Sequence, residues 1–130
     1  MKKLIAKALA SVLNRTADYN GWSNYETWAV NMWVTNDQGS DEYWRELTDK
    51  VVRKNLFDKH NATIDVSDAL KDQIEQDRPE MENSLYSDLL GAAMSEINYY
   101  EIAENWVDEV FEEIKDEDPV PPVDDLDKGY

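Results

Sequence analysis

The side chains most able to do chemistry in this sequence are carboxylates, and they gather toward its C-terminal end. Residues 101–130 hold twelve of the 29 acidic residues. Adjacent acids such as Asp108–Glu109 and Glu112–Glu113 are the kind of pair that general acid–base catalysis uses. Chance alone supplies such pairs in so acidic a chain. We therefore expect no enzyme, while a hydrolase that uses paired carboxylates stays as a lesser alternative.

Other sources of chemistry are sparse. The single histidine, His60, falls in a segment that reads as a connector, where an exposed loop histidine is the ordinary finding. The absence of cysteine rules out a thiolate nucleophile, a thiolate metal site and a disulfide, and it fits a reducing cytoplasm. A calcium loop with Gly39 at its sixth position would need carboxylates at Val34 and Arg45. We expect no metal and no cofactor.

The spacing of the acids is more informative than their pairing. Glu101, Glu104, Asp108, Glu112 and Asp116 stand three or four residues apart, so on a helix they share one face about 5–6 Å from one another. Successive phosphates of a DNA strand are separated by a similar distance. This pattern favours mimicry of DNA toward a basic groove, and the alternative is a solvated face that serves solubility. The expected partner-binding residues are Glu101, Glu104, Asp108, Glu109, Glu112, Glu113, Asp116, and two aromatic anchors, Trp22 and Tyr25.

The overall charge limits the partners. A formal charge of -16 disfavours direct binding to nucleic acid or to an anionic membrane, and favours a basic protein surface. No stretch approaches the ~20 apolar residues needed to span a bilayer. The expected partner is the basic groove of a nucleic-acid-binding protein, and a homodimer is left open.

The elements that must position these residues are predicted to be helices. Ser23 with Glu26 fits a capping box that opens a first core helix, and Gly39 is a left-handed stop for it. Ser40 then opens a second helix, followed by a connector over 60–63. The apolar positions expected to be buried on these two helices are Trp28, Ala29, Met32 and Trp33, then Tyr43, Trp44, Leu47, Val51 and Leu56.

Three further segments complete the predicted core. A short helix capped by Asp65 or Ser67 should end before Pro79. Ser84 should open the next helix, and Asn98 the last. The apolar faces expected to point inward are Val66, Ala69, Leu70 and Ile74, then Leu85, Leu89, Leu90, Ala93 and Met94, then Ile102, Trp106, Val110 and Ile114.

The chain thus reads as an all-α protein with one domain of five or six short helices. Residues 1–20 form a basic amphipathic helix, which could lie on a membrane surface or, as we prefer, dock on the acidic remainder. Residues 21–115 form the helical core domain. Residues 116–130 form an acidic, proline-rich tail that we expect to be disordered.

One stretch resembles a known family. The segment 24–28, Asn-Tyr-Glu-Thr-Trp, matches the hallmark of a family of small phage and plasmid proteins, and 87–98 with 101–105 is similar to that family's second block. The family has no assigned activity, so the resemblance implies no catalytic residues. It implies a mobile-element context, in which small acidic proteins neutralise host defences.

From the charge and that context we expect an inhibitor of a host nucleic-acid-targeting defence complex, of the anti-CRISPR or anti-restriction kind, in the cytoplasm of an infected bacterium. The alternative is a non-catalytic phage structural or regulatory interaction module whose acidity serves solubility. Analogy of this kind does not by itself establish a function.

Overall fold

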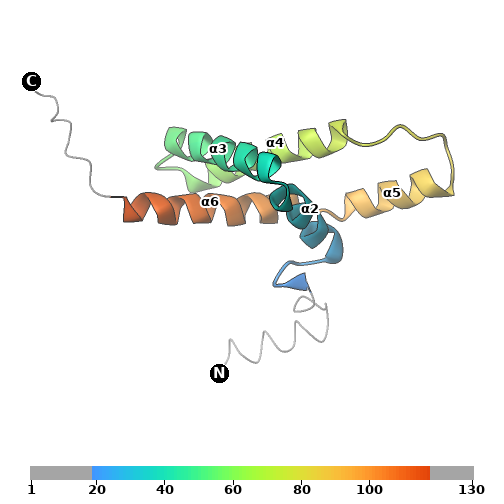
Figure 1. Cartoon of the computed structure of the whole chain (residues 1–130), viewed down its shortest axis with the longest axis horizontal. Helices are drawn as coiled ribbons and strands as arrows, with labels where there is room; N and C mark the ends of the chain where they lie inside the picture. The colour runs from blue at the N-terminus through green and yellow to red at the C-terminus, as the bar shows by residue number, and fades with distance from the viewer. Residues whose placement is uncertain (1–18, 118–130) are drawn as a thin grey trace, which may run out of the picture.

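Five α-helices and no strand make up the part of the chain that the computed structural model describes, residues 19–117. The predicted all-α class is confirmed for these residues. Figure 1 shows α3, α4 and α6 lying lengthwise beside one another, with α2 crossing near the start of α6 and α5 extending to one side. The helices are α2 (Tyr25–Asn36), α3 (Gln38–Lys54), α4 (Lys59–Gln76), α5 (Leu85–Ser95) and α6 (Tyr99–Asp116).

The core lies between α3, α4 and α6, which all pack on one another, and α2 packs on α3 and α6. Its largest fully buried side chains are apolar residues such as Leu70 and Ile102. Burying each such side chain contributes about 1.5–3 kcal/mol, so these contacts hold α6 in place. The remaining buried apolar residues are Trp44, Val52, Ala62, Val66, Ala103, Val107 and Val110.

The start of α2 differs from the prediction. Asn24, not Ser23, is the N-cap, and its side chain accepts a hydrogen bond from the backbone N–H of Thr27 at 2.8 Å. Ser23 donates instead to the carboxylate of Glu101, from its backbone N–H and from its hydroxyl at 2.6 Å. Ser23 is therefore held by a tertiary contact with Glu101 and not by the predicted capping box with Glu26.

The predicted glycine stop after α2 is wrong. Gly39 lies inside α3, and the left-handed conformation occurs earlier, at Asn20 and Gly21 in the turn before α2. Asp37 separates the two helices because its extended backbone ends α2 and its side chain caps α3, accepting from the N–H of Ser40 at 2.9 Å. The buried stripe of α3 is Trp44, Thr48 and Val52, whereas the predicted core residues Tyr43 and Leu56 are exposed.

The predicted connector at 60–63 is also wrong, because α4 already begins at Lys59. Asp58 caps this helix by accepting from the N–H of Asn61 at 3.0 Å, so neither Asp65 nor Ser67 is the cap. Ala62 and Thr63 are buried, which makes this segment part of the core.

The cap of α5 is confirmed, but its predicted inward face is wrong. Ser84 accepts from the N–H of Ser87 as expected. However, α5 has no buried residue, and Leu85 and Leu89 are 67% and 58% exposed. Gly91 approaches the side chain of Arg78 rather than another helix.

The last helix matches its prediction. Asn98 caps α6 by accepting from the N–H of Glu101, and Ile102 and Val110 are buried, with Trp106 and Ile114 packed beside them. The helix ends at Asp116, one residue past the predicted domain boundary. The predicted N-terminal helix over 1–20 lies almost wholly outside the described residues, as does nearly all of the predicted tail. None of the described helices is long and apolar enough to cross a membrane.

Candidate interaction surface

The side of α6 that faces away from the core carries acids in two rows. One row borders α4, and its members Glu104 and Asp108 share a hollow with Lys59. The other borders α3, where Glu109 and Glu113 line a cavity with Asp41 and other α3 residues. We call these the α4-side row (Glu104, Asp108, Glu112) and the α3-side row (Glu109, Glu113).

The α4-side row forms an ion pair with Lys59 of α4. The ammonium of Lys59 pairs with Asp108 Oδ1 at 2.5 Å and lies 5.9 Å from the centre of the Phe111 ring. The hydrogen bond to Asp108 raises the pKa of Lys59, although partial burial opposes it. Glu112 faces Lys115 at 3.6 Å, and Glu104 makes no ion pair with any described residue. This row is thus only partly neutralised.

His60 lies beside the α4-side row, where its Nδ1 is 2.9 Å from the Tyr100 hydroxyl. Both side chains are exposed. The sequence placed this histidine in a loop, whereas it stands in the first turn of α4. In residues 19–117 no group of three His, Asp or Glu side chains is arranged to hold a metal ion.

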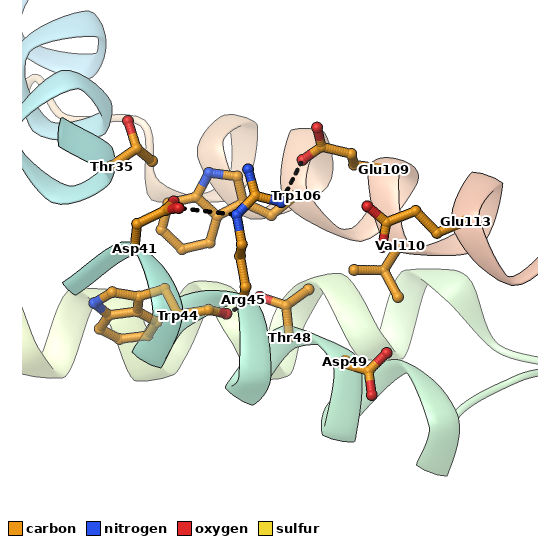
Figure 2. Close-up of a pocket in the computed structure, with 10 residues that line it drawn as sticks. All are labelled: Thr35, Asp41, Trp44, Arg45, Thr48, Asp49, Trp106, Glu109, Val110 and Glu113. Atoms are coloured by element: carbon orange, nitrogen blue, oxygen red, sulfur yellow. Dashed lines mark hydrogen bonds and ion pairs between the residues drawn. The ribbon is translucent and has the colours of Figure 1, made fainter. Parts of the chain in front are cut away.

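The α3-side row faces a single guanidinium. Arg45 Nε is 2.9 Å from Asp41 Oδ2, and Arg45 Nη1 is 4.0 Å from Glu109 Oε1. The hydrogen bond that Arg45 donates to Asp41, with the charges of Asp41 and Glu109, raises the pKa of Arg45. Figure 2 shows this guanidinium between the two carboxylates, with the Trp106 ring behind it. Because Arg45 and Glu109 are each 58% exposed, the bond between them is weak.

A cavity of about 280 Å³ lies between α3 and α6, and Arg45 is part of its lining. Its apolar lining comes from Trp44, Trp106 and Val110, and the two indole rings lie 5.8 Å apart. The Trp106 Nε1–H donates to the side-chain oxygen of Asn31 at 2.9 Å, which fixes the ring. Acids from both helices stand at the edge of the cavity: Asp41, Asp49, Glu109 and Glu113.

The remaining predicted site residues fall into different places. Glu101 uses its carboxylate on Ser23, so it joins the start of α2 to α6. Asp116 is exposed at the far end of α6. Trp22 is half-buried and packs against the core. Tyr25 is 54% exposed, and its ring lies beside that of Trp28. The structure does not bring these two aromatics into the acidic rows.

Exposed apolar side chains are the feature that sequence reasoning missed. Trp33, predicted to be core, is 75% exposed, and Tyr86 on α5 is 70% exposed. The residues of α2 are apolar on nearly every side, so their spacing could not show which side faces solvent.

The net charge belongs to the described region. Residues 19–117 hold 24 of the 29 acidic residues and eight of the 13 basic ones. The whole formal charge of -16 therefore lies on the helical part, and the flanking segments cancel each other.

The two sequence blocks that carry the family resemblance meet in space. The side-chain amide of Asn24 donates to the backbone oxygen of Glu96 at 2.8 Å. The hydroxyl of Thr27 accepts from the backbone N–H of Asn98 at 2.9 Å, and Thr27 is fully buried. These contacts join the start of α2 to the junction of α5 and α6, so part of the hallmark segment serves the fold.

Comparison with known proteins gives a family and nothing finer. No curated protein matches the chain. No solved structure matches it either. A family profile covers residues 15–118, which includes all five helices described above. The chain belongs to that family, DUF7249, a family of unknown function.

Proposed function

We propose that this protein is a phage- or mobile-element-encoded inhibitor of a host nucleic-acid-targeting defence complex, of the anti-CRISPR or anti-restriction kind. It acts without catalysis, by placing an acidic surface that mimics DNA in the basic groove of its target. The α4-side row, the α3-side row and Asp116 form this surface.

The observation that carries the proposal is the concentration of uncompensated carboxylates on one helix. Glu104, Glu113 and Asp116 make no ion pair with any described residue, and Glu109 reaches its partner only at 4.0 Å. Acids that are not already paired are available to basic side chains of a partner. Acids that are already in salt bridges would leave fewer carboxylates free to bind the partner.

The geometry of α6 supports the same proposal. A helix rises about 1.5 Å per residue, so acids four residues apart repeat about every 6 Å along the axis. Helix α6 packs on α2, α3 and α4, and its first turn is held by Asn98 and Glu101. The backbone positions of these acids are therefore fixed before binding, and only their side chains have to be ordered when the target binds.

The test is a pulldown against purified CRISPR effectors and restriction complexes, with and without competing duplex DNA, over a range of salt concentrations. DNA displaces a mimic because both ligands use the same basic groove. The affinity of a mimic also falls as salt rises, because salt screens the contacts between its acids and the basic groove. Capture that DNA does not affect would contradict mimicry and indicate inhibition at another surface. Failure to capture any complex would remove the defence role.

A second candidate is a phage interaction module whose acidity serves solubility. The exposed apolar side chains of Trp33, Leu85, Tyr86 and Leu89 favour it, since apolar exposure often marks protein–protein contacts. This candidate predicts that binding to its partner survives neutralisation of the α6 acids.

A further inference from the structure

The cavity between α3 and α6 differs from the rest of the acidic surface because it has depth and an aromatic wall. A volume of about 280 Å³ is below the ~300–1,000 Å³ usual for small-molecule and cofactor sites. It is suited to one long side chain. Trp106 is held by Asn31, and Trp44 is 6% exposed, so the apolar wall is preformed.

The charges at the edge of this cavity are unbalanced. Of its four carboxylates, Asp41 is bonded to Arg45 and Asp49 is bonded to Arg53 at 3.0 Å. Glu109 has only the 4.0 Å contact with Arg45, and Glu113 has no ion pair with a described residue. The uncompensated charge therefore lies on the α6 side of the cavity, on Glu109 and Glu113, which are one helical turn apart.

We propose that this cavity binds an arginine side chain of the target protein, with its guanidinium between Glu109 and Glu113 and its alkyl stem against Trp106 and Val110. The proposal rests on the proposed function, since it names the side chain through which the target's basic groove is held. It assigns the α3-side row a specific contact beyond general charge.

The chemistry of the cavity fits arginine better than lysine. A guanidinium is planar, donates from several nitrogens at once and stacks on an indole face, whereas an ammonium is a compact and strongly hydrated charge. The protein already shows this arrangement on a small scale, because Arg45 lies between Asp41 and Glu109 in front of Trp106 (Figure 2). An incoming guanidinium would occupy the neighbouring position toward Glu113.

The first experiment needs no target protein. Full-length, ¹⁵N-labelled protein is titrated with N-acetyl-arginine methylamide, with the lysine analogue and with the neutral citrulline analogue, and its amide and indole signals are followed by NMR. We expect saturable shifts at the Trp106 indole and at the amides of Glu109 and Glu113 with the arginine probe. The lysine probe should bind at least threefold more weakly, and the citrulline probe should cause no saturable shift.

Two variants with equal charge change locate the site on α6. The double substitution Glu109→Gln with Glu113→Gln should weaken probe binding at least tenfold. The matched control, Glu104→Gln with Glu112→Gln, removes the same charge from the α4-side row and should change it less than twofold. Equal effects of the two variants, or probe shifts spread evenly over both rows, would overturn the proposal. Unchanged dispersion of the other signals verifies folding of each variant.

A second experiment separates this proposal from the proposed function. If a defence complex is captured, the α3-side variant should lose at least tenfold more affinity for it than the α4-side variant. Equal losses would reject the arginine site and leave DNA mimicry standing. Specific probe binding without capture of any complex would support the site and reject the defence role.

Discussion

The hydroxyl of Thr27 is predicted to be worth more to stability than a hydroxyl of the same type elsewhere in the core. Thr27 is fully buried, and its Oγ1 accepts the backbone N–H of Asn98 at 2.9 Å, across 71 residues of sequence. Thr27→Val keeps the shape but leaves that N–H without a partner. An orphaned donor of this kind costs about 1–3 kcal/mol.

The matched control is Thr63→Val. Thr63 is 2% exposed, but its hydroxyl donates to the carbonyl of Lys59, one turn earlier in α4, which the helix already bonds. Removing it orphans no group, so we expect a change within about 0.5 kcal/mol. Both substitutions thus change the side-chain volume by the same small amount, but only Thr27→Val leaves a backbone N–H, that of Asn98, without a partner.

Urea unfolding followed by circular dichroism at 222 nm measures both free energies of unfolding. With that cost of about 1–3 kcal/mol, Thr27→Val should also lower Tm by about 4–24 °C, given the usual 4–8 °C per kcal/mol for a domain near this size. Equal losses in Thr27→Val and Thr63→Val would refute the reasoning, because the contact to Asn98 would then contribute nothing of its own.

Two further predictions concern stability. In urea titrations, Leu70→Ala should lower the free energy of unfolding by about 2–5 kcal/mol because Leu70 is fully buried. Leu89→Ala should lower it by less than about 0.5 kcal/mol because Leu89 is 58% exposed. Equal losses would mean that α5 belongs to the core. Burial, with a smaller effect of Glu75, raises the pKa of Tyr99 above its ordinary 10.0, so the folded state holds this proton more tightly. Stability from this group is full below that value and falls as pH rises through the folded pKa. Tyr99→Phe should remove the part of the fall that sets in as pH rises past 10.0.

Local patterns predicted α6 well because its determinants are local. Asn98 lies three residues before the N–H that it caps, and the apolar residues from Ile102 to Ile114 recur at helical spacing. Both signals can be recognised within one helix. The acidic rows followed from the same helix, since residues kept off the apolar face must face solvent or its border.

Tertiary contacts account for what the sequence could not show. Glu101 shares a face with the other acids, but its carboxylate accepts a hydrogen bond from Ser23, which lies 78 residues earlier in the chain. The apolar pattern of α5 indicates a helix without indicating a partner, so Leu85 and Leu89 were assigned to a core that they do not reach. The cavity arises only where Trp44 of α3 meets Trp106 of α6, and no spacing along either helix predicts that meeting.

The central claim is that carboxylates of α6, and not acidity in general, bind the target. Its most direct measurement is the affinity for a captured defence complex of two triple variants with equal charge change. One carries Glu104→Gln, Glu112→Gln and Asp116→Asn on α6. The other carries Asp65→Asn, Asp68→Asn and Asp72→Asn, three exposed acids of α4.

At about 1 kcal/mol for each carboxylate that contacts the target, the α6 variant should bind roughly 100-fold more weakly near 0.1 M salt, with a shallower dependence on salt. The α4 variant should lose less than about threefold, because its acids contribute only to the long-range field, which salt screens. A similar loss in both variants would contradict the account and leave acidity as a property of the whole surface.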